Sequence, residues 1–414
     1  MPKWKNKLIC GDNLEVLAKF FKPESVDLIY IDPPFFSNRN YEIIWGDEAE
    51  IRSFDDRWEG GINVYVNWMK ERVLELHRIL KPTGTFYLHC DWHAGHYLKV
   101  MCDDVFGYNN FRNEIAWCYR GAGYPKKDFG KRHDTIFRYS KTDEYVFNLD
   151  DVREEYAEAT KERFKHYVGN VRKAGDFGVQ SLNPLGKQPD DWWQIQPIAP
   201  SAKERLGYPT QKPEKLLERI IKASSNRGDL VLDSFCGCGT ACAVAERLQR
   251  RWIGIDISPS AIALVKKRLS RIGVREKNLD IVGMPKKAAD LRNFKPFEFQ
   301  YWVINEMHGM PSPRLAGDLG IDGLSFIDHY PIQVKQSEKV GRPVVDSFET
   351  AIRRYYKNHK GNFRGYIVAF SFGKGAYEEV ARVKQEGIII DLITVQDILD
   401  KKFQLKHNPP EVLL

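Results

Sequence analysis

With 414 residues and 43% hydrophobic content, the chain is long enough for two or three domains with well-buried cores. It contains no apolar run of about 18 residues, and its first residues lack the apolar core of a signal peptide. We therefore expect no membrane span and a cytoplasmic location. The formal net charge of +7 is compatible with a polyanionic partner but does not identify one.

The cysteines also favour a reducing compartment, because all seven lie before residue 243 and form no even framework of disulfide partners. Cys236, Cys238 and Cys242 lie close together, but this spacing lacks the second ligand pair of a zinc site. We expect small side chains that pack in a turn and a helix.

The N-terminal part of the chain alternates between apolar runs and amphipathic segments, which predicts a β-α-β arrangement with parallel strands. A first strand ends at Gly11-Asp12, a helix follows, and the apolar run Leu28–Ile31 is typical of a strand buried on both faces. The further elements expected up to residue 119 are a covering loop at 42–62, helices at 63–80 and 93–106, and strands at 85–91 and 113–119.

The strand at Leu28–Ile31 must end abruptly, because Asp32-Pro33-Pro34-Phe35 follows it and proline cannot donate to a strand ladder. An acid and an aromatic ring are therefore held at the carboxyl end of a strand, where open α/β sheets bind their ligands. Taken alone, the run is explained equally well by a strand-ending turn with a capping acid.

Glycines, aromatic residues and basic residues are interleaved at the start of the stretch 120–200. Aromatic faces stack on bases and cations neutralise phosphates, so this composition suits a nucleic acid. An ordinary solvated loop is the alternative, and the position of the stretch between two motifs favours contact with DNA.

A second buried strand ends at Asp233, and the turn Phe235-Cys236-Gly237-Cys238-Gly239 leads into a helix at 241–249. Glycines permit positive φ and let a backbone approach a ligand closely. The next strand ends at Asp256, an acid that can accept both hydroxyls of a ribose. The G-x-G-x-x-G spacing of dinucleotide folds is absent, which disfavours a dehydrogenase.

Together these motifs resemble those of DNA amino-methyltransferases that use S-adenosylmethionine, which pair a D-P-P-Y/F/W loop with an F-x-G-x-G donor loop. The catalytic loop precedes the donor loop here, and Tyr208-Pro-Thr-Gln-Lys-Pro213 stands before the donor strand, an order that resembles the β-class. The resemblance covers residues 7–273. It implies a Rossmann-like α/β methyltransferase sheet with an inserted target-recognition region.

The resemblance also implies a role for each motif residue. Asp256 would hold the ribose of the donor, Asp12 would contact its adenine ring or amino group, and Thr210–Lys212 would border its methionine end. The expected catalytic residues are Asp32, Pro33, Pro34 and Phe35, and the expected donor-binding residues are Asp12, Thr210, Gln211, Lys212, Asp233, Phe235, Gly237, Gly239 and Asp256.

An exocyclic amine is a poor nucleophile because its lone pair is delocalised, so the base must leave the stack and its N–H groups need acceptors. Asp32 and the Pro33 carbonyl would accept these protons, and Phe35 would stack on the flipped base, without a metal. Aspartate at position 32 favours adenine N6, because cytosine-N4 enzymes of this family usually carry serine there. Cytosine N4 and an RNA substrate stay open as alternatives.

After a polar linker at 275–295, a second α/β unit is expected. Its predicted helices lie at 297–307, 344–356 and 376–385, and its predicted strands at 325–328, 332–336, 365–370 and 388–392.

Within this unit, Asp322 precedes the run Gln333-Val334-Lys335, whose two polar side chains share a strand face. Residues 296–400 resemble the Mrr-like branch of the PD-(D/E)xK restriction endonucleases, although many of these nucleases carry an acid at the position of Gln333. The resemblance implies that Asp322 holds Mg²⁺ and that Lys335 orients the attacking water. Glu298 or Glu306 is a candidate for a further acid, and a silent DNA-binding or docking module is the alternative.

We therefore predict a restriction–modification fusion that acts on double-stranded DNA, with its oligomeric state open and a homodimer among the alternatives. Its predicted parts are a methyltransferase core at 1–119 and 201–274, a target-recognition region at 120–200, a linker at 275–295 and a nuclease domain at 296–414.

Overall fold

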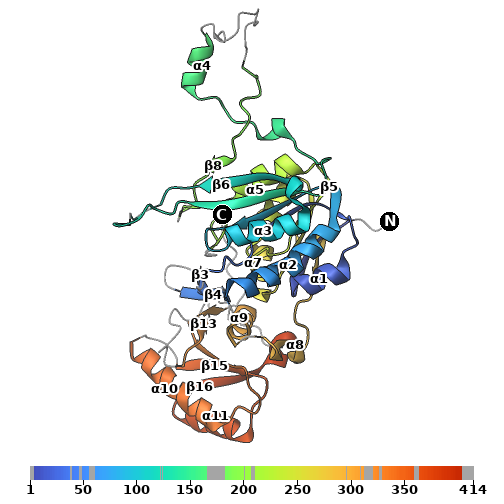
Figure 1. The fold of residues 1–414 in the computed structure, drawn as a ribbon. Helices are drawn as coiled ribbons and strands as arrows, with labels where there is room; N and C mark the ends of the chain where they lie inside the picture. The colour runs from blue at the N-terminus through green and yellow to red at the C-terminus, as the bar shows by residue number, and fades with distance from the viewer. Residues whose placement is uncertain are drawn as a thin grey trace, which may run out of the picture.

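The computed structural model describes residues 4–37, 40–45, 49–55, 61–121, 123, 125–165, 182–199, 201–206, 210–294, 296–307, 309–311, 320–325, 329–358 and 363–402. Two α/β units follow one another along the chain (Figure 1). The strands of the larger unit's main sheet are β1 (Asn6–Cys10), β2 (Val26–Ile31), β5 (Leu80–Cys90), β6 (Phe111–Cys118), β7 (His133–Ser140), β8 (Trp192–Gln194), β9 (Leu230–Asp233), β10 (Arg251–Asp256) and β11 (Leu279–Val282).

These nine strands form one sheet in the order β11-β1-β10-β9-β2-β5-β7-β6-β8. The strands from β11 to β5 are parallel, while β7 is antiparallel to both of its neighbours. The larger unit also contains α1 (Asn13–Phe20), α2 (Ile62–Ile79), α3 (Gly95–Phe106), α4 (Glu158–Lys165), α5 (Glu214–Ser224), α6 (Thr240–Arg247), α7 (Pro259–Arg271) and short 3-10 helices at Tyr108–Asn110, Leu149–Val152 and Glu276–Asn278.

Helices cover both faces of this sheet and produce two separate cores. Residues of α1, α2 and α3 pack on one face, and residues of α5, α6 and α7 pack on the other. Leu28 and Tyr30 of β2 belong to one core and Ile29 and Ile31 to the other, so the prediction of a strand buried on both faces is confirmed. The predicted Rossmann-like α/β class is therefore confirmed.

Two predicted boundaries need correction. The stretch 120–200 contributes β7 and β8 to the main sheet, and the linker at 275–295 contributes β11, which pairs with β1, and α8 (Ala288–Arg292). Interleaved basic and aromatic residues obscured the strand pattern of β7 in the sequence. The strands β8 and β11 are too short to show a clear period.

The expected covering loop at 42–62 overlaps an antiparallel hairpin, β3 (Asn40–Trp45) and β4 (Ala49–Asp55). Its strand β4 lies beside β12 (Gly309–Pro311) of the second unit. No helix of the described part of the chain is long and apolar enough to cross a membrane.

The second unit has a five-stranded sheet whose order follows the chain from β12 to β16. Helices again cover both faces, with α9 on one and α10 and α11 on the other. The predicted strand at 325–328 begins earlier, and residues 326–328 lie outside the described residues. The remaining elements are β13 (Gly323–Ser325), β14 (Pro331–Lys335), β15 (Arg364–Ala369), β16 (Ile389–Thr394), α9 (Pro296–Glu306), α10 (Arg342–Asn358), α11 (Lys374–Gln385) and α12 (Val395–Leu399).

A tight turn at Gly283 carries the chain from the first unit toward the second. Gly283 has φ +80°, and a Cβ atom there would lie 2.0 Å from the backbone oxygen of Cys10. The chain then passes over the carboxyl end of β1 and reaches α8 and α9, and α9 packs against α7. The amide of Asn305 donates a hydrogen bond to the Ser260 hydroxyl across this boundary (3.4 Å).

We expect Gly283→Ala to lower the free energy of unfolding more than the control Gly273→Ala, whose φ is +86° but whose Cβ would meet nothing within 4 Å. The left-handed conformation costs alanine about 1–2 kcal/mol at either position, and the clash adds about 1–3 kcal/mol at Gly283. Denaturant unfolding of the two variants measures the difference. Equal losses would show that the turn relaxes away from Cys10.

Candidate active site

The carboxyl ends of four neighbouring strands, β1, β10, β9 and β2, meet at one edge of the main sheet. Register brings Cys10 beside Asp256, and Asp233 beside both Gly254 and Tyr30. A cavity of about 830 Å³ lies at this edge, within the roughly 300–1,000 Å³ typical of ligand sites. Of the predicted catalytic and donor-binding residues it is lined by Asp12, Asp32, Pro33, Pro34, Phe35, Thr210, Gln211, Lys212, Asp233, Phe235, Gly237 and Asp256.

The predicted catalytic loop is held in place by an ion pair at its first residue. Asp32 Oδ2 lies 2.8 Å from Lys212 Nζ, and both side chains are largely buried. Among the described residues, the other carboxylate oxygen of Asp32 is buried without a hydrogen-bond partner. The Tyr65 hydroxyl donates a hydrogen bond to the Pro34 carbonyl (2.5 Å), which fixes the turn after the acid. Asp32 thus has one oxygen in an ion pair and one buried oxygen whose hydrogen-bonding capacity is unused among the described residues.

A buried polar chain lies beneath Phe35. The Phe35 and His89 rings have centroids 5.7 Å apart, and the Lys212 ammonium lies 4.9 Å from the centroid of Phe35. His89 Nδ1 is hydrogen-bonded to the Tyr30 hydroxyl (2.9 Å), and its Nε2 lies 3.2 Å from Asp134. Burial opposes ionisation of Asp134, but its contacts with His89, the charge of Lys212 and the hydrogen bond from Tyr119 together outweigh burial and lower the pKa of the carboxyl. These contacts fix the ring plane behind Phe35.

The donor turn is built by backbone amides and two carboxylates. Asp256 Oδ2 accepts from the amide of Gly237 (2.8 Å) and Oδ1 from the amide of Ser258 (2.9 Å). Gly237 and Gly239 have φ of +47° and +73°, as the turn prediction requires, and a Cβ on Gly239 would lie 2.6 Å from Val265. Of these two glycines only Gly237 lines the cavity, while Gly239 is the N-cap of α6 and lies against Val265 of α7.

Acidic side chains dominate the cavity. Seven acids and one lysine are among its described lining residues. Burial raises the pKa of Asp233 well above its usual range, and the nearby charges of Asp32 and Asp256 add to this shift. Burial also raises the pKa of Asp256 to about 6, and Glu298 adds to the shift. The negative potential suits a ligand with positive charge.

Asp12 caps α1 and pairs with a buried arginine. Its Oδ1 accepts from the Leu14 amide (2.9 Å), and its Oδ2 lies 2.7 Å from Arg72 Nη2. The Arg72 guanidinium stacks on Trp68, 3.8 Å from the ring centroid, and Trp68 lines the cavity. Asp12 is therefore at the cavity, with both oxygens already accepting from protein groups, and its contact with the donor stays a prediction.

The run Thr210–Lys212 lines the same cavity, but the side chains of Gln211 and Lys212 bond to other groups of the protein. Gln211 donates to the carbonyl of Glu204 (2.6 Å) and accepts from the amide of Leu206 (2.8 Å). Lys212 pairs with Asp32, the predicted catalytic acid. Their predicted contacts with the methionine end of the donor stay predictions, and Tyr208 and Pro209 lie outside the described residues.

Tyr65, Trp68, Arg72 and His89 support the site and were not among its predicted residues. Tyr65, Trp68 and Arg72 are spaced by three and four residues on α2, so they lie on one helix face. Such a polar and aromatic face on the first long helix after the catalytic loop was a usable signal. The sequence holds no comparable signal for His89, whose partners come from strands that the tertiary fold brings together.

The second predicted site lies along β14, a central strand of the second sheet. The amide of Asp322 donates to the carbonyl of Ile332 (2.8 Å), and the amide of Val334 donates to Asp322 Oδ2 (2.7 Å). Asp322 therefore lies beside the strand that carries Gln333 and Lys335, as predicted. Gln333 is 3% exposed, and its Oε1 has no hydrogen-bond partner among the described residues. Of the two candidate acids on α9, Glu298 lines the cavity of the first unit.

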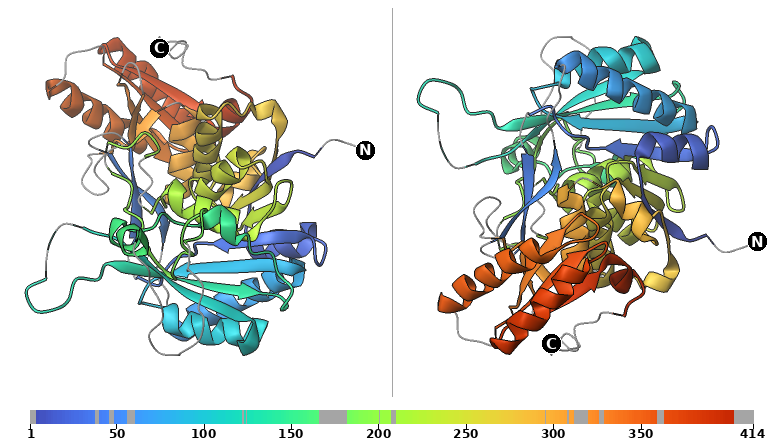
Figure 2. Two further views of the ribbon diagram at one scale, coloured as in Figure 1. Left: turned by 90° about the horizontal axis from the view of Figure 1, so that it is seen from above. Right: turned by 90° about the horizontal axis from the view of Figure 1, so that it is seen from below.

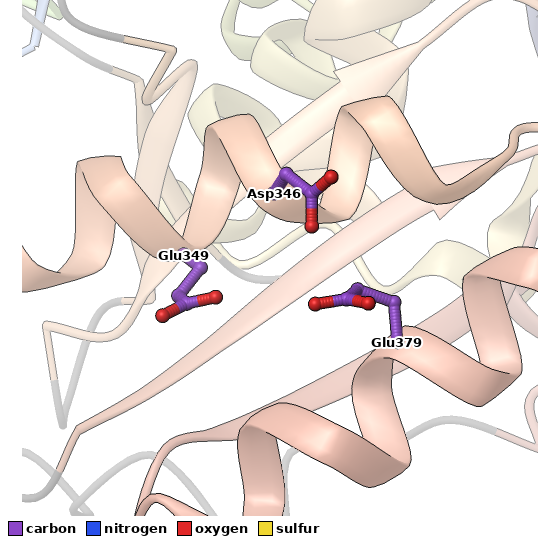
Figure 3. Close-up of side chains that lie close together, drawn as sticks. All are labelled: Asp346, Glu349 and Glu379. Carbon is purple, nitrogen blue, oxygen red and sulfur yellow. The ribbon is translucent and has the colours of Figure 1, made fainter.

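A cluster of acids on α10 and α11 is an ion-pair network rather than a metal site. The side chains of Asp346, Glu349 and Glu379 point toward one another (Figure 3), with one ligand atom of each within 4.8 Å of the others. Arg342 lies 3.1 Å from Glu379 and 3.4 Å from Asp346, and Arg382 lies 2.6 Å from Glu349. A cation would have to displace these arginines.

Comparison with known proteins identifies both units. Residues 26–267 match the family model described as DNA methylase, and residues 291–401 match the one described as restriction endonuclease. The chain belongs to the DNA methylase family. Its first unit is a DNA methyltransferase that uses S-adenosylmethionine, and DNA is its substrate. The predicted methyltransferase and the predicted Mrr-like C-terminal domain are confirmed at the level of family.

Curated relatives share the methyltransferase part of the chain. The type II methyltransferase M.HpaI of Haemophilus parainfluenzae is 33% identical over 64% of this chain and 74% of its own length. The type II methyltransferase M.BglII of Bacillus subtilis is 31% identical over 64% of this chain and 69% of its own. The DNA adenine methyltransferase YhdJ of Escherichia coli is 32% identical over 63% of this chain and 82% of its own.

We expect the affinity for S-adenosylhomocysteine to fall below pH 6. If Asp256 accepts hydrogen bonds from the ribose as predicted, the ionised form binds more tightly, and its pKa of about 6 lets protons compete at lower pH, by about tenfold per unit. Calorimetric titration between pH 5 and 8 measures this change. Asp256→Asn should bind more weakly, with an affinity that is flat across the same range. An unchanged wild-type affinity at pH 5 would contradict a role for ionised Asp256.

Proposed function

We propose that the methyltransferase unit methylates the exocyclic N6 of an adenine flipped out of double-stranded DNA, and that the C-terminal unit is a Mg²⁺-dependent DNA endonuclease. The observation that carries the first part is Asp32, which lines the cavity beside Phe35 and whose buried Oδ1 has no hydrogen-bond partner among the described residues. An amino group that enters the cavity would donate a hydrogen bond to this oxygen.

The cavity fits S-adenosylmethionine by shape and by charge. Gly237 lets the backbone approach the ligand, and the acidic lining attracts a cation. When bound, the donor supplies a methyl group on a positively charged sulfonium. Loss of that methyl group leaves a neutral product, so the same acidic side chains hold the product less strongly.

The chain's own residues position the base and stabilise the positive charge that develops on its amine during methyl transfer. Asp32 accepts a hydrogen bond from one N–H group of the amine, and the Pro33 carbonyl is the proposed acceptor for the other. Phe35 stacks on the flipped base, where stacking contributes about 1–3 kcal/mol. Lys212 acts as a positioning residue, because its ion pair at 2.8 Å fixes the Asp32 carboxylate in one orientation.

Two observations support adenine as the target base. Position 32 carries aspartate, and YhdJ, which is 32% identical, is named a DNA adenine methyltransferase. Cytosine N4 is the alternative, and identification of the methylated nucleoside after enzymatic digestion of the DNA separates the two.

Exposed aromatic and basic residues near the site support contact with duplex DNA. Trp92 is half exposed, and the Lys131 ammonium lies 3.4 Å from its ring centroid. Phe129 is 98% exposed on the segment between β6 and β7 that projects from the sheet (Figure 1). The seven unpaired cysteines fit the predicted reducing cytoplasm, and the homodimer stays a prediction.

The nuclease proposal is supported by the family match and by the oxygen groups along β14. Asp322 and the buried Oε1 of Gln333 are the groups that would hold Mg²⁺, an ion that prefers oxygen ligands. Mg²⁺ would polarise the scissile phosphate. Lys335, on the same strand face as Gln333, would orient the attacking water.

Asp32→Asn should reduce kcat for methyl transfer by about 100- to 1,000-fold, because one acceptor for the developing charge is lost. Affinity for S-adenosylhomocysteine should stay near that of the wild type. Transfer of tritiated methyl groups to DNA and calorimetry measure the two effects. Asp104→Asn on the exposed surface of α3 is the control and should behave like the wild type. Full transfer by Asp32→Asn would refute the mechanism.

The full chain should cut unmethylated plasmid DNA in the presence of Mg²⁺, and Lys335→Ala should abolish cutting while methyl transfer continues. Lys384→Ala, on the exposed side of α11, is the matched control and should still cut. Gel electrophoresis of the plasmid records the result. An absence of cutting by the wild-type chain would favour the alternative of a silent docking module.

A further inference from the structure

The wall of the methyl-donor cavity is not made by the methyltransferase unit alone. Four residues from α8, α9 and the segment between them also line it: Asp290, Asn293, Phe294 and Glu298. These residues lie at the start of the second unit, where α8 and α9 are placed between the two sheets (Figure 1; Figure 2). Residues from 291 onward match the restriction endonuclease family.

Glu298 lies on α9, which packs against α7, the helix that follows β10. Its negative charge raises the pKa of Asp256 and also that of the Cys10 thiol, for which burial is the larger cause. Cys10 and Asp256 are register partners at the ends of β1 and β10. Glu298 therefore faces the β1–β10 side of the cavity. Asp32 and Lys212 lie on the opposite side, at the end of β2.

The two sides of the cavity correspond to the two ends of the donor, its adenosine end and its methyl-bearing end. Asp256, the proposed ribose acceptor, lies on the β1–β10 side with the exposed side chain of Ile257, while the methyl group must approach Asp32. The adenosine end therefore lies toward α8 and α9. The Phe294 ring and the Glu298 carboxylate offer that end an apolar face and a hydrogen-bond acceptor.

The second unit is held at this position by close contacts with the first. The Gly283 turn touches the backbone of Cys10, α9 packs on α7, and Asn305 donates a hydrogen bond to Ser260. An apolar core anchors the same segment from the other side, since Phe294 packs against the cluster that contains Leu291 and Phe299. The wall thus belongs to both units.

We propose that the C-terminal unit completes the methyl-donor site, with Glu298 accepting a hydrogen bond from the adenosine end of the donor and Phe294 covering it. This inference rests on the proposed donor orientation. Because binding at a shared wall is reciprocal, donor occupancy also fixes α8 and α9 against the methyltransferase unit. The restriction endonuclease unit is thereby sensitive to whether a methyl donor is bound.

Calorimetry on the full chain tests the contact with two ligands, cationic S-adenosylmethionine and neutral S-adenosylhomocysteine. Glu298→Ala should weaken both by about tenfold, the loss expected for one hydrogen bond to a charged group, and the isosteric Glu298→Gln should fall between. Glu378→Gln, on the exposed surface of α11 in the same unit, is the control and should bind like the wild type. Loss confined to S-adenosylmethionine would indicate a charge effect only and overturn the adenosine contact, as would equal binding by all variants.

Hydrogen exchange provides a second readout, which is the protection of backbone amides in α8 and α9. S-adenosylhomocysteine should slow exchange in α8 and α9 of the wild-type chain, and less so in Glu298→Ala. Protection confined to the turn at Gly237 would show that the donor binds without the second unit and would overturn the proposal. If the wild-type chain bound neither ligand, the donor site itself would be refuted, a result distinct from the failure of this inference.

Discussion

The chemistry of this protein depends on one constraint, namely that parallel strands bring their carboxyl ends to the same edge of a sheet. β1, β10, β9 and β2 are neighbours in space although β2 and β9 are separated by about half of the chain. Each strand end therefore adds a carboxylate to one cavity, from Asp12, Asp256, Asp233 and Asp32. Negative charge that would be costly in a closed core is placed where the proposed cationic donor would balance it.

The acids remain distinct because their surroundings differ. Asp233 is almost fully buried, and burial raises its pKa. Asp256 accepts hydrogen bonds from two backbone amides, which oppose the rise in pKa that burial causes. Asp32 has an ammonium partner in Lys212, and Asp12 has a guanidinium partner in Arg72. Four carboxylates of one type can thus serve different purposes within one cavity.

The second unit is more than an appended domain. The chain leaves β11, turns at Gly283 against β1 and enters α8 beside the donor cavity. The residues that predict a nuclease lie farther along, Asp322 just before β13 and Gln333 and Lys335 on β14. Glu298, on the preceding helix α9, lines the cavity of the methyltransferase unit. One short segment therefore contacts the cavity of the first unit and the core of the second.

The sequence by itself determined the fold class and the two turns that end β2 and β9, because prolines, glycines and buried apolar runs restrict the backbone locally. It also indicated the C-terminal nuclease family through Asp322 and the Gln333–Lys335 strand. Only the tertiary structure decided which side chains share a cavity: the pairing of Asp32 with Lys212, the chain from His89 to Asp134, and the place of Glu298. These contacts join residues far apart in the chain, and local periodicity carries no information about such distances.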